Sequence, residues 1–420
     1  MTSTLFTNVR IFDGSGADSF AGEVLVEGER IAGVARDGQR LDRGAARVID
    51  GGGATLMPGL IESHAHLGFA SCIDRPPGFG PMLEPDVRAE ATTHAGAVLL
   101  DYGFTSAYSA GAIDAALEVS LREKFASGDL PGPRLRACSF ERDGAAAAHG
   151  GPGIFQSAHL RQPDVEGMRA WATAMAAMGL DSLKVVLSGE SGLQPGTSRI
   201  VQFYDEELSA AAEVAHEQGL WLNGHCHATD AIKQALRHGF RVLYHCTWAD
   251  EEAIDMMEAR KDEIFVAPAP GINWANLNEG AAFGITREVA EIQEQHITLE
   301  RVCELMPKLK KRGIRVLPGG DYGFPWNPIG RNARDLQLFV ELFGYTPTEA
   351  LSAATMLGGQ IMGMGDELGL IRQGYLADIL LVDGDPTGDV AILQDKGRIS
   401  AVMKAGRFHR APSLDQAIRA

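Results

Sequence analysis

The sequence predicts a mixed α/β fold in which a (β/α)8 TIM barrel stands beside a small discontinuous β-sandwich built from both termini. The middle of the chain alternates short apolar segments with longer helical patterns, which is typical of a parallel sheet. Both ends are rich in short strand patterns instead, and neither is long enough to bury a core alone. We therefore expect residues 1–57 with 366–420 to form the sandwich, and residues 58–365 to form the barrel.

The strand patterns at the two ends are similar in kind. Residues 4–12 alternate in polarity, and residues 23–28 pair naturally with residues 30–34 across a tight turn. Near the other end, residues 377–384 and 399–407 have the same strand character. Both ends are therefore expected to pair within one β unit beside the barrel.

Eight candidate strands occupy the middle of the chain. They are residues 58–66, 103–109, 133–140, 181–188, 219–226, 241–247, 263–269 and 314–321. Helical patterns lie between most of them, for instance from Glu206 to Gln218 and from Asp230 to His238. Eight β/α units over about 300 residues fit a (β/α)8 barrel, whose functional site lies at the C-terminal ends of its strands.

Composition and charge limit the possible partners. The chain has 420 residues and a formal net charge of −17, which disfavours nucleic acid and anionic membranes because both need basic patches. Its start lacks the pattern of a signal peptide, and it contains no run of 18 apolar residues. The five cysteines are scattered and odd in number, which suits a reducing compartment. We expect a cytoplasmic homo-oligomer that acts on a small molecule.

Metal-ligating residue types recur at the predicted strand ends. His64 and His66 close the first strand, and their side chains project to one face because strand side chains alternate. Further residues of this kind end later strands: Lys184, His225, His227, His245 and Asp321. A single histidine at a strand end is more often a hydrogen-bonded core residue. Independent accidents would not place so many at one edge, so the pattern predicts a divalent-metal site.

Two of these residues leave alternatives open. An ammonium cannot ligate a metal, so Lys184 is either a carbamate that bridges two cations or an unmodified lysine beside one metal. His225 and His227 are spaced like the first pair, and either could be the ligand. We favour His225 because it lies nearer the strand, which leaves His227 as a substrate contact.

The residues resemble the amidohydrolase superfamily over nearly the whole chain, in its imidazolonepropionase-related, prolidase- and carboxypeptidase-like branch. Leu56 to His66 resembles the strand-1 signature of that family, and Gly319-Gly320-Asp321 resembles its strand-8 signature. The resemblance implies two divalent ions, zinc first and Co, Mn or Fe otherwise, bridged by N6-carboxylysine at Lys184. The implied ligands are His64, His66, Lys184, His225, His245 and Asp321. Glu62, the strand-2 end and Asn223 depart from the family pattern, which leaves the substrate open.

The expected chemistry is hydrolysis of an amide C–N bond by a metal-bound hydroxide. Asp321 is predicted to carry the proton from the hydroxide to the leaving nitrogen, and His149 to stabilise the tetrahedral intermediate. The predicted substrate contacts are His227, Tyr108, Arg75, Trp248, Trp274 and Tyr322. Trp326 follows a strand end in the same way, so these aromatic residues are predicted to wall an apolar or aryl pocket.

Several functions remain open on the sequence. The amide substrate could be an N-acyl amino acid, a dipeptide or an aryl amide of the mycotoxin type. A phenylurea, arylurea or carbamate would suit the same site. A mononuclear heterocycle deaminase is a further alternative, which Lys184 argues against because one-metal members generally have no use for it. A scaffold protein on a retired barrel is disfavoured by the complete set of ligands.

Overall fold

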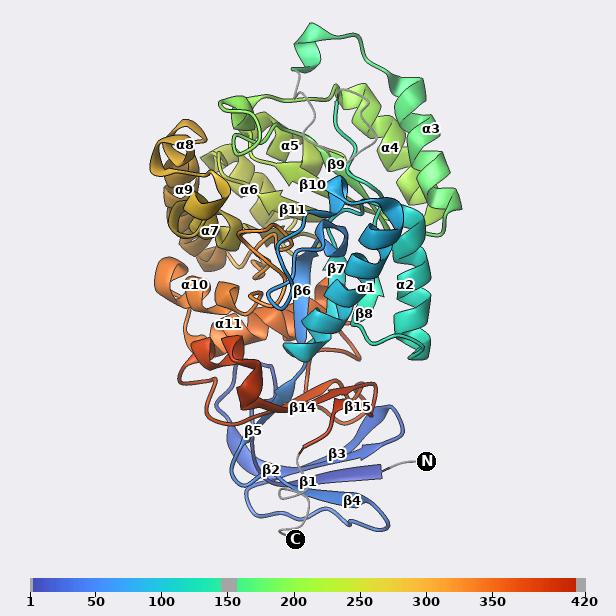
Figure 1. Cartoon of the computed structure of the whole chain (residues 1–420), viewed down its shortest axis with the longest axis vertical. Helices are drawn as coiled ribbons and strands as arrows, with labels where there is room; N and C mark the ends of the chain where they lie inside the picture. The colour runs from blue at the N-terminus through green and yellow to red at the C-terminus, as the bar shows by residue number, and fades with distance from the viewer. Residues whose placement is uncertain (1–2, 145–156, 413–420) are drawn as a thin grey trace.

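The structure is a computed structural model that describes residues 3–144 and 157–412. The described chain is a mixed α/β fold in which the helices and parallel strands of the middle region lie above a sheet made from both ends of the chain (Figure 1). Within these residues, no helix is both long enough and apolar enough to cross a bilayer.

The two ends of the chain share one eight-stranded sheet. Its strands are β1 (Ser3–Ile11), β2 (Phe20–Glu27), β3 (Arg30–Arg36), β4 (Arg47–Asp50), β5 (Thr55–Pro58), β13 (Ile379–Val382), β14 (Ile399–Lys404) and β15 (Arg407–Arg410). Their order is β15-β14-β13-β5-β1-β2-β3, with β4 paired to β1. The antiparallel pair β5 and β13 joins the ends, with Leu56 opposite Leu381. The division of this sheet into two facing layers, and the domain limits, stay predictions.

The central strands form two parallel sheets. One contains β6 (Leu60–Ala65), β7 (Phe104–Ser109) and β8 (Arg134–Arg136), and the other contains β9 (Ser182–Val186), β10 (Trp221–Cys226), β11 (Val242–His245) and β12 (Phe265–Ala267). Isolated parallel bridges join Cys138 to Ser182, Val266 to Val316 and Ala65 to Tyr322. Residues 314–321, the predicted eighth strand, form no ladder and are tied to the strands on either side by the last two of these bridges.

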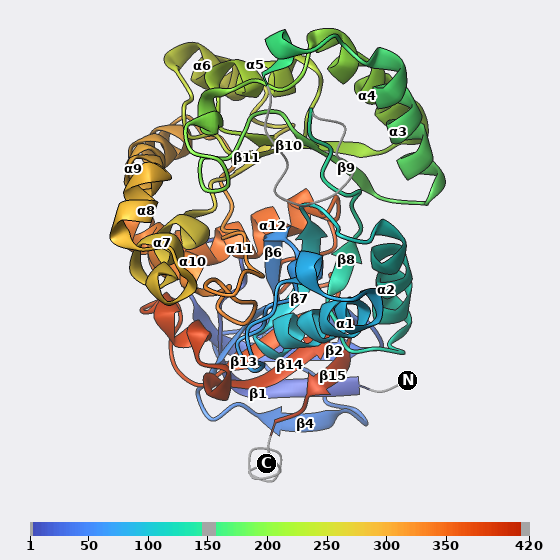
Figure 2. The same ribbon diagram turned by 45° about the horizontal axis from the view of Figure 1, so that its top comes forward.

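The helices are arranged around these strands, as Figures 1 and 2 show. They are α1 (Pro85–Asp101), α2 (Ala115–Ser127), α3 (Val165–Ala177), α4 (Asp205–Gln218), α5 (Thr229–Arg237), α6 (Glu251–Ala259), α7 (Pro270–Asn278), α8 (Arg287–Ile292), α9 (Gln295–Lys311), α10 (Arg334–Phe343), α11 (Pro347–Ala354) and α12 (Met356–Ile361). The helices predicted at residues 206–218 and 230–238 correspond to α4 and α5, and their bounds agree within one residue at each end.

The short link between the terminal sheet and β6 depends on one glycine. A Cβ atom at Gly59 would lie 2.1 Å from the buried hydroxyl of Thr105, so a larger residue cannot enter without moving β7. The Gly59 amide donates to the carbonyl of Asp378 (2.9 Å), and the Asp378 carboxylate accepts from Arg134 (2.8 Å). These bonds hold the terminal sheet against the strand that carries the histidine pair.

A buried carboxyl under the helices gives a test of the packing. Glu118 on α2 accepts hydrogen bonds from the Ser109 hydroxyl (3.0 Å) and from the Cys138 amide (3.2 Å). Burial raises the pKa of Glu118 from 4.5 to about 7. The folded state therefore holds this proton more tightly than the unfolded chain does. The associated stability is complete below pH 4.5 and is lost as the pH rises through 7.

We therefore expect Glu118→Gln to flatten the pH dependence of stability. Between pH 5 and 8, the free energy of unfolding of the wild type should fall relative to that of the variant, by about 3 kcal/mol at most. Denaturant titrations at the two pH values measure this difference. Glu123→Gln, at an exposed position of the same helix, is the control. Parallel profiles for wild type and Glu118→Gln would contradict the prediction.

Candidate metal centre

A cavity of about 290 Å³ lies at the C-terminal ends of the central strands. All the residues predicted as metal ligands from the strand ends line it: His64, His66, Lys184, His225, His227, His245 and Asp321. The convergence follows from the parallel sheets, because strands that run in one direction present their ends at one edge.

The histidine pair of β6 lies beside Asp321. The Nε2 atom of His66 is 3.4 Å from Asp321 Oδ1, and the Nε2 atom of His64 is 3.9 Å from the same oxygen. His66 Nδ1 donates to the carbonyl of Gly111 (3.0 Å), which fixes the tautomer and leaves Nε2 free as a ligand. These three side chains therefore converge on one carboxylate oxygen at the cavity.

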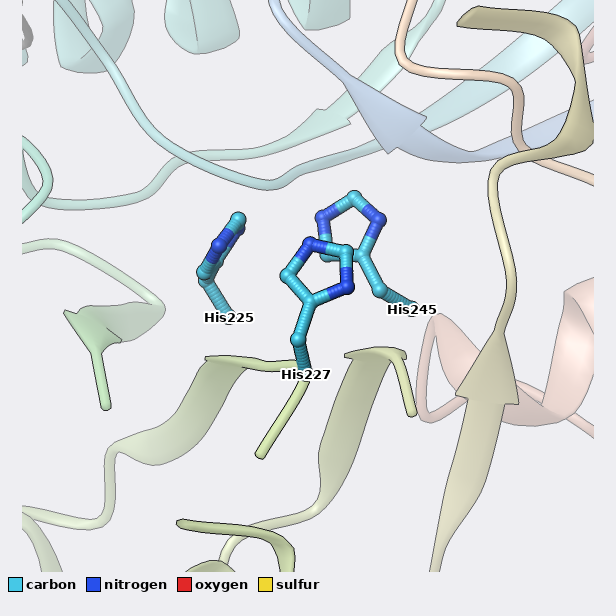
Figure 3. A group of neighbouring side chains, drawn as sticks. All are labelled: His225, His227 and His245. Atoms are coloured by element: carbon cyan, nitrogen blue, oxygen red, sulfur yellow. The ribbon is translucent and has the colours of Figure 1, made fainter. Parts of the chain in front are cut away.

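Three further histidines converge from β10 and β11 (Figure 3). The ring centroid of His245 is 4.5 Å from that of His225 and 4.4 Å from that of His227. Both nitrogens of His227 have partners, since Nε2 lies 2.8 Å from Glu190 Oε2 and Nδ1 lies 2.7 Å from the Thr247 hydroxyl. His225 Nε2 has only longer contacts, of 3.4 Å to the carbonyl of Gly189 and 3.8 Å to Glu190 Oε2. This difference favours His225 as the ligand and leaves His227 at the cavity wall.

Lys184 occupies the centre of the cluster. Its side chain is fully buried, and Nζ donates to the carbonyl of Ala110 (2.6 Å) and lies 3.1 Å from Glu141 Oε1. The same nitrogen lies 4.4 Å from the ring centroid of Tyr244. Burying an ammonium without a partner is costly, so Glu141 compensates this charge. Glu141 is absent from the residues predicted from the sequence. It directly follows the third predicted strand, and this position at a strand end is the signal that could have found it.

Burial keeps the histidines of this cluster neutral. It lowers the pKa of His66 to about 4 and that of His225 to about 3, and it holds the pKa values of His64 and His245 well below 6.5. Lys184 lowers all four further. Neutral imidazoles carry the lone pairs that a metal ion requires.

Carboxylates complete the charge pattern of the site. Burial raises the pKa of Asp321 to about 8, against the opposing effect of Lys184. Burial alone would also raise the pKa of Glu190, but His227 and His225 lower it to about 2. The hydrogen bond from His227 Nε2 to Glu190 Oε2 (2.8 Å) contributes to this lowering, so the contact favours the charged form of Glu190.

Three buried polar atoms of the cluster have no hydrogen-bond partner: His64 Nδ1, His245 Nε2 and Asp321 Oδ1. Such atoms are rare in folded proteins because each costs desolvation free energy without return. Two imidazole nitrogens and a carboxylate oxygen are also the donor types that Zn²⁺ and similar ions prefer. His64, His245 and Asp321 bring ligand atoms within 4.8 Å of one another, as do His225, His227 and His245. The residues present therefore fit a divalent metal ion.

The backbone is strained where two of these ligands are attached. His245, Cys246 and Asp321 all have positive φ values, of 70°, 56° and 57°. Non-glycine residues adopt this conformation at a free-energy cost, and such strain concentrates at functional sites. The side-chain amide of Asn327 holds one of these turns by donating to the carbonyls of Gly320 (2.9 Å) and Asp321 (3.1 Å).

Five predicted substrate contacts lie outside the cavity. Tyr108 and Tyr322 are fully buried, and their hydroxyls donate to Asn223 and Asp335, at 2.8 Å in both cases. Neither side chain lines the cavity.

Arg75, Trp248 and Trp274 also lie outside the cavity lining. Arg75 is exposed and faces Glu90 at 3.2 Å. The Trp248 indole donates to the Ser198 hydroxyl (3.2 Å), and the guanidinium of Arg334 stacks 4.5 Å from the Trp274 ring. Of the predicted substrate contacts, His227 lines the cavity. Trp326, which was predicted as part of the aryl pocket, also lines it. His149 lies outside the described residues and stays a prediction.

The structure adds cavity residues that the sequence analysis did not name. Besides aliphatic and amide side chains, they include three acidic and four aromatic residues: Glu141, Asp143 and Glu190, and Phe69, Phe79, Phe283 and Phe324. Phe69 and Phe324 each lie three residues beyond a predicted ligand, His66 and Asp321, which is the one signal that could have found them.

Comparisons with known proteins agree with this geometry. An ochratoxinase of Aspergillus niger is 28% identical over 267 residues, which are 63% of this chain and 53% of that enzyme, so the match spans about half its length. An imidazolonepropionase of Ectopseudomonas mendocina is 26% identical over 411 residues, covering 94% of this chain and 95% of that protein. The crystal structure of a Xaa-Pro dipeptidase with bound methionine has the same fold, with a TM-score of 0.81 at 22% identity over 98% of this chain and 100% of that chain.

The predicted resemblance is thereby confirmed. A sequence model of the Amidohydrolase family matches residues 55–408, a stretch that begins in β5 and includes every residue of the metal cluster. Because this match covers far more than half of the 420 residues, the chain belongs to the amidohydrolase family.

Proposed function

We propose that this protein is a metal-dependent hydrolase that cleaves amide C–N bonds. The observation that carries the proposal is the cluster of neutral imidazoles around Asp321, with unsatisfied atoms on His64, His245 and Asp321 itself. Membership of the amidohydrolase family supports the reaction class. The names of two relatives, an ochratoxinase and a Xaa-Pro dipeptidase, support an amide as the bond that is broken.

The proposal includes the architecture that carries the site. We propose that the seven central strands and residues 314–321 close into a (β/α)8 barrel. The bridges from Val316 to Val266 and from Tyr322 to Ala65 support closure on one side, and the bridge from Cys138 to Ser182 supports it on the other. Closure accounts for the meeting of the first and eighth strand ends at His64 and Asp321.

Two metal positions are consistent with the residues present. His64, His66 and Asp321 would hold one ion, and His225 and His245 would hold the other, with Lys184 between them as N6-carboxylysine. Zinc suits the nitrogen-rich ligand set best, and Co, Mn or Fe would also be accepted. Such ions polarise a carbonyl and lower the pKa of bound water towards neutral pH.

Asp321 is the residue placed to move protons. Its Oδ1 atom is buried, faces the cavity and has no hydrogen-bond partner. A carboxylate in this position can accept a proton from the attacking water and release it to the nitrogen that leaves. Asn327 supports this role, because its two hydrogen bonds to the backbone hold the turn that presents Asp321.

Carboxylation of Lys184 should depend on metal binding. A carbamate forms when the ammonium first loses one proton and the resulting neutral amine attacks CO₂ and releases a second, so that a cation becomes an anion. In the structure the ammonium is paired with Glu141 at 3.1 Å, so carboxylation would place two anions side by side. That arrangement is stable only when cations are bound next to it. Carboxylated lysine and bound metal should therefore occur together.

Arylureas and carbamates are the second candidate substrates. The observation that favours them is the group of aromatic residues in the cavity, which fits a flat aryl group as well as it fits an aryl amide. A mononuclear deaminase is the less favoured reading, since it would leave Lys184, His225 and Glu141 without a function.

Asp321→Asn tests the proton transfer. The amide keeps one oxygen for a metal but cannot carry a proton, so we expect metal content close to that of the wild type and a kcat lower by about 100-fold or more. Metal analysis with a hydrolysis panel of anilides, N-acyl amino acids, dipeptides and phenylureas measures both quantities. Asp262→Asn, at an exposed position outside the cavity, should change neither. Normal turnover by Asp321→Asn would remove the proposed role.

Lys184→Ala tests the bridging carbamate. We expect the metal content to fall from two ions per chain towards one, activity to be lost, and both to recover partly when a small carboxylic acid fills the space of the carbamate. Lys404→Ala is the matched control, because Lys404 is a half-buried lysine that donates to the carbonyl of Phe125 (2.7 Å), outside the cavity. A Lys184→Ala variant that keeps two metals and full activity without added acid would contradict the carbamate.

A further inference from the structure

The wall of the cavity beyond the metal cluster is built from contacting aromatic rings. We define the aromatic wall as Phe69, Phe79, Phe283, Phe324 and Trp326, all of which line the cavity. Its ring centroids lie 4.9 Å apart between Phe69 and Phe324, 5.4 Å between Phe79 and both of these, 5.3 Å between Phe324 and Trp326, and 6.0 Å between Phe283 and Trp326. The wall is therefore one continuous surface.

The aromatic wall begins at a metal ligand. The ring of Phe69 stacks on that of His66 with centroids 4.3 Å apart and planes at 8°. A substrate whose reacting bond lies at His66 would thus place its neighbouring group against Phe69 and Phe324. Aromatic pairs of this kind stabilise a complex by about 0.5–1.5 kcal/mol each beyond area burial. The geometry favours a flat aromatic group next to the bond that is cleaved.

The charges around the cavity have one sign apart from Lys184. Among the described lining residues, Lys184 is the only lysine or arginine, and Glu141 already pairs with it at 3.1 Å. Four carboxylates line the same cavity: Glu141, Asp143, Glu190 and Asp321. A substrate carboxylate would lose its hydration here without gaining a cationic side chain.

The cavity offers two neutral polar groups to a ligand. The Trp326 indole N–H and the Asn276 side-chain oxygen are buried, without a hydrogen-bond partner, and both residues line the cavity. The Asn276 amide nitrogen donates to Gln295 (2.8 Å), which fixes the orientation and leaves the oxygen as an acceptor. A donor and an acceptor of this kind match an uncharged polar group on a ligand.

We propose that the cavity selects uncharged amides with an aromatic group beside the scissile bond and discriminates against amides that carry a free carboxylate. The inference rests on the proposed amide hydrolysis and narrows its substrate class, because dipeptides and N-acyl amino acids both carry a carboxylate. Discrimination arises because no lysine or arginine of the described lining, other than Lys184 beside the proposed metal positions, can pair with the carboxylate, and not from a steric limit.

A matched pair of substrates tests the selection on the metal-loaded enzyme. N-phenethylbenzamide and N-benzoylphenylalanine share both rings and the amide, and they differ only in the carboxylate. We expect kcat/KM to be at least about tenfold higher for the uncharged amide, which is the effect of one unfavourable polar interaction. An equal or higher value for N-benzoylphenylalanine would overturn the proposal.

A cation introduced at the cavity should reverse the discrimination. Leu193 lines the cavity and is 54% exposed, so Leu193→Arg should raise kcat/KM for N-benzoylphenylalanine several-fold while Leu193→Gln does not. Ile297→Arg is the matched control, because this residue is 44% exposed, lies outside the cavity lining and makes the same change to the net charge of −17. Equal effects of the two arginine variants would show that overall charge, and not the cavity, causes the discrimination.

Binding measurements separate this inference from the proposed reaction. If neither amide is hydrolysed, the proposed function fails, but calorimetry still compares their affinities for the protein. We expect N-phenethylbenzamide to bind more tightly, and its affinity to fall about tenfold in Trp326→Leu. Trp248→Leu, which changes a tryptophan outside the cavity lining, should bind it as the wild type does. Equal binding of the two amides, or equal losses in the two variants, would overturn the selection itself.

Discussion

The buried ammonium of Lys184 is the constraint to which the rest of the site is fitted. It lies on β9 between the histidines of β6 and those of β10 and β11, in a place where an unpaired charge would cost several kcal/mol. Glu141, the carbonyl of Ala110 and the ring of Tyr244 provide the compensation. Burial lowers the pKa values of the surrounding histidines and this charge lowers them further, which favours the neutral imidazoles that a metal ion would require.

The residues at the base of the cavity could be predicted from the sequence because their positions are local properties of strands. A residue near the C-terminal end of a parallel strand reaches the common edge whatever the connecting loops do, and His64, Lys184, His225 and His245 do meet at the cavity, while their role as ligands stays a prediction. The aromatic residues could not be placed this way. Trp248 lies only three residues after His245, yet its loop turns the indole to Ser198. Its direction depends on loop packing, which one sequence does not contain.

The segment predicted as the eighth strand lies where it was expected in the fold, but it does not have the geometry of a strand. Leu317 to Asp321 was predicted as a strand end, but Pro318 lacks an amide donor and Asp321 has a φ of 57°, so no ladder forms. The glycines between them are required by close contacts. A Cβ atom at Gly319 would lie 2.5 Å from the Ser63 hydroxyl, and one at Gly320 would lie 2.3 Å from the Asp335 carboxylate. This irregular turn is what brings Asp321 to His66.

The two ends of the cavity are therefore formed by different kinds of segment. Its base uses side chains fixed on strands, where a change of residue alters the chemistry itself. Its aromatic wall comes from segments that follow β6 and Asp321, and from residues around α7 and Phe283, none of which lies on a central strand. Segments of this kind tolerate substitution without unfolding the scaffold. In the proposal made here, the choice among amides therefore belongs to the wall and not to the base, which any amide could use.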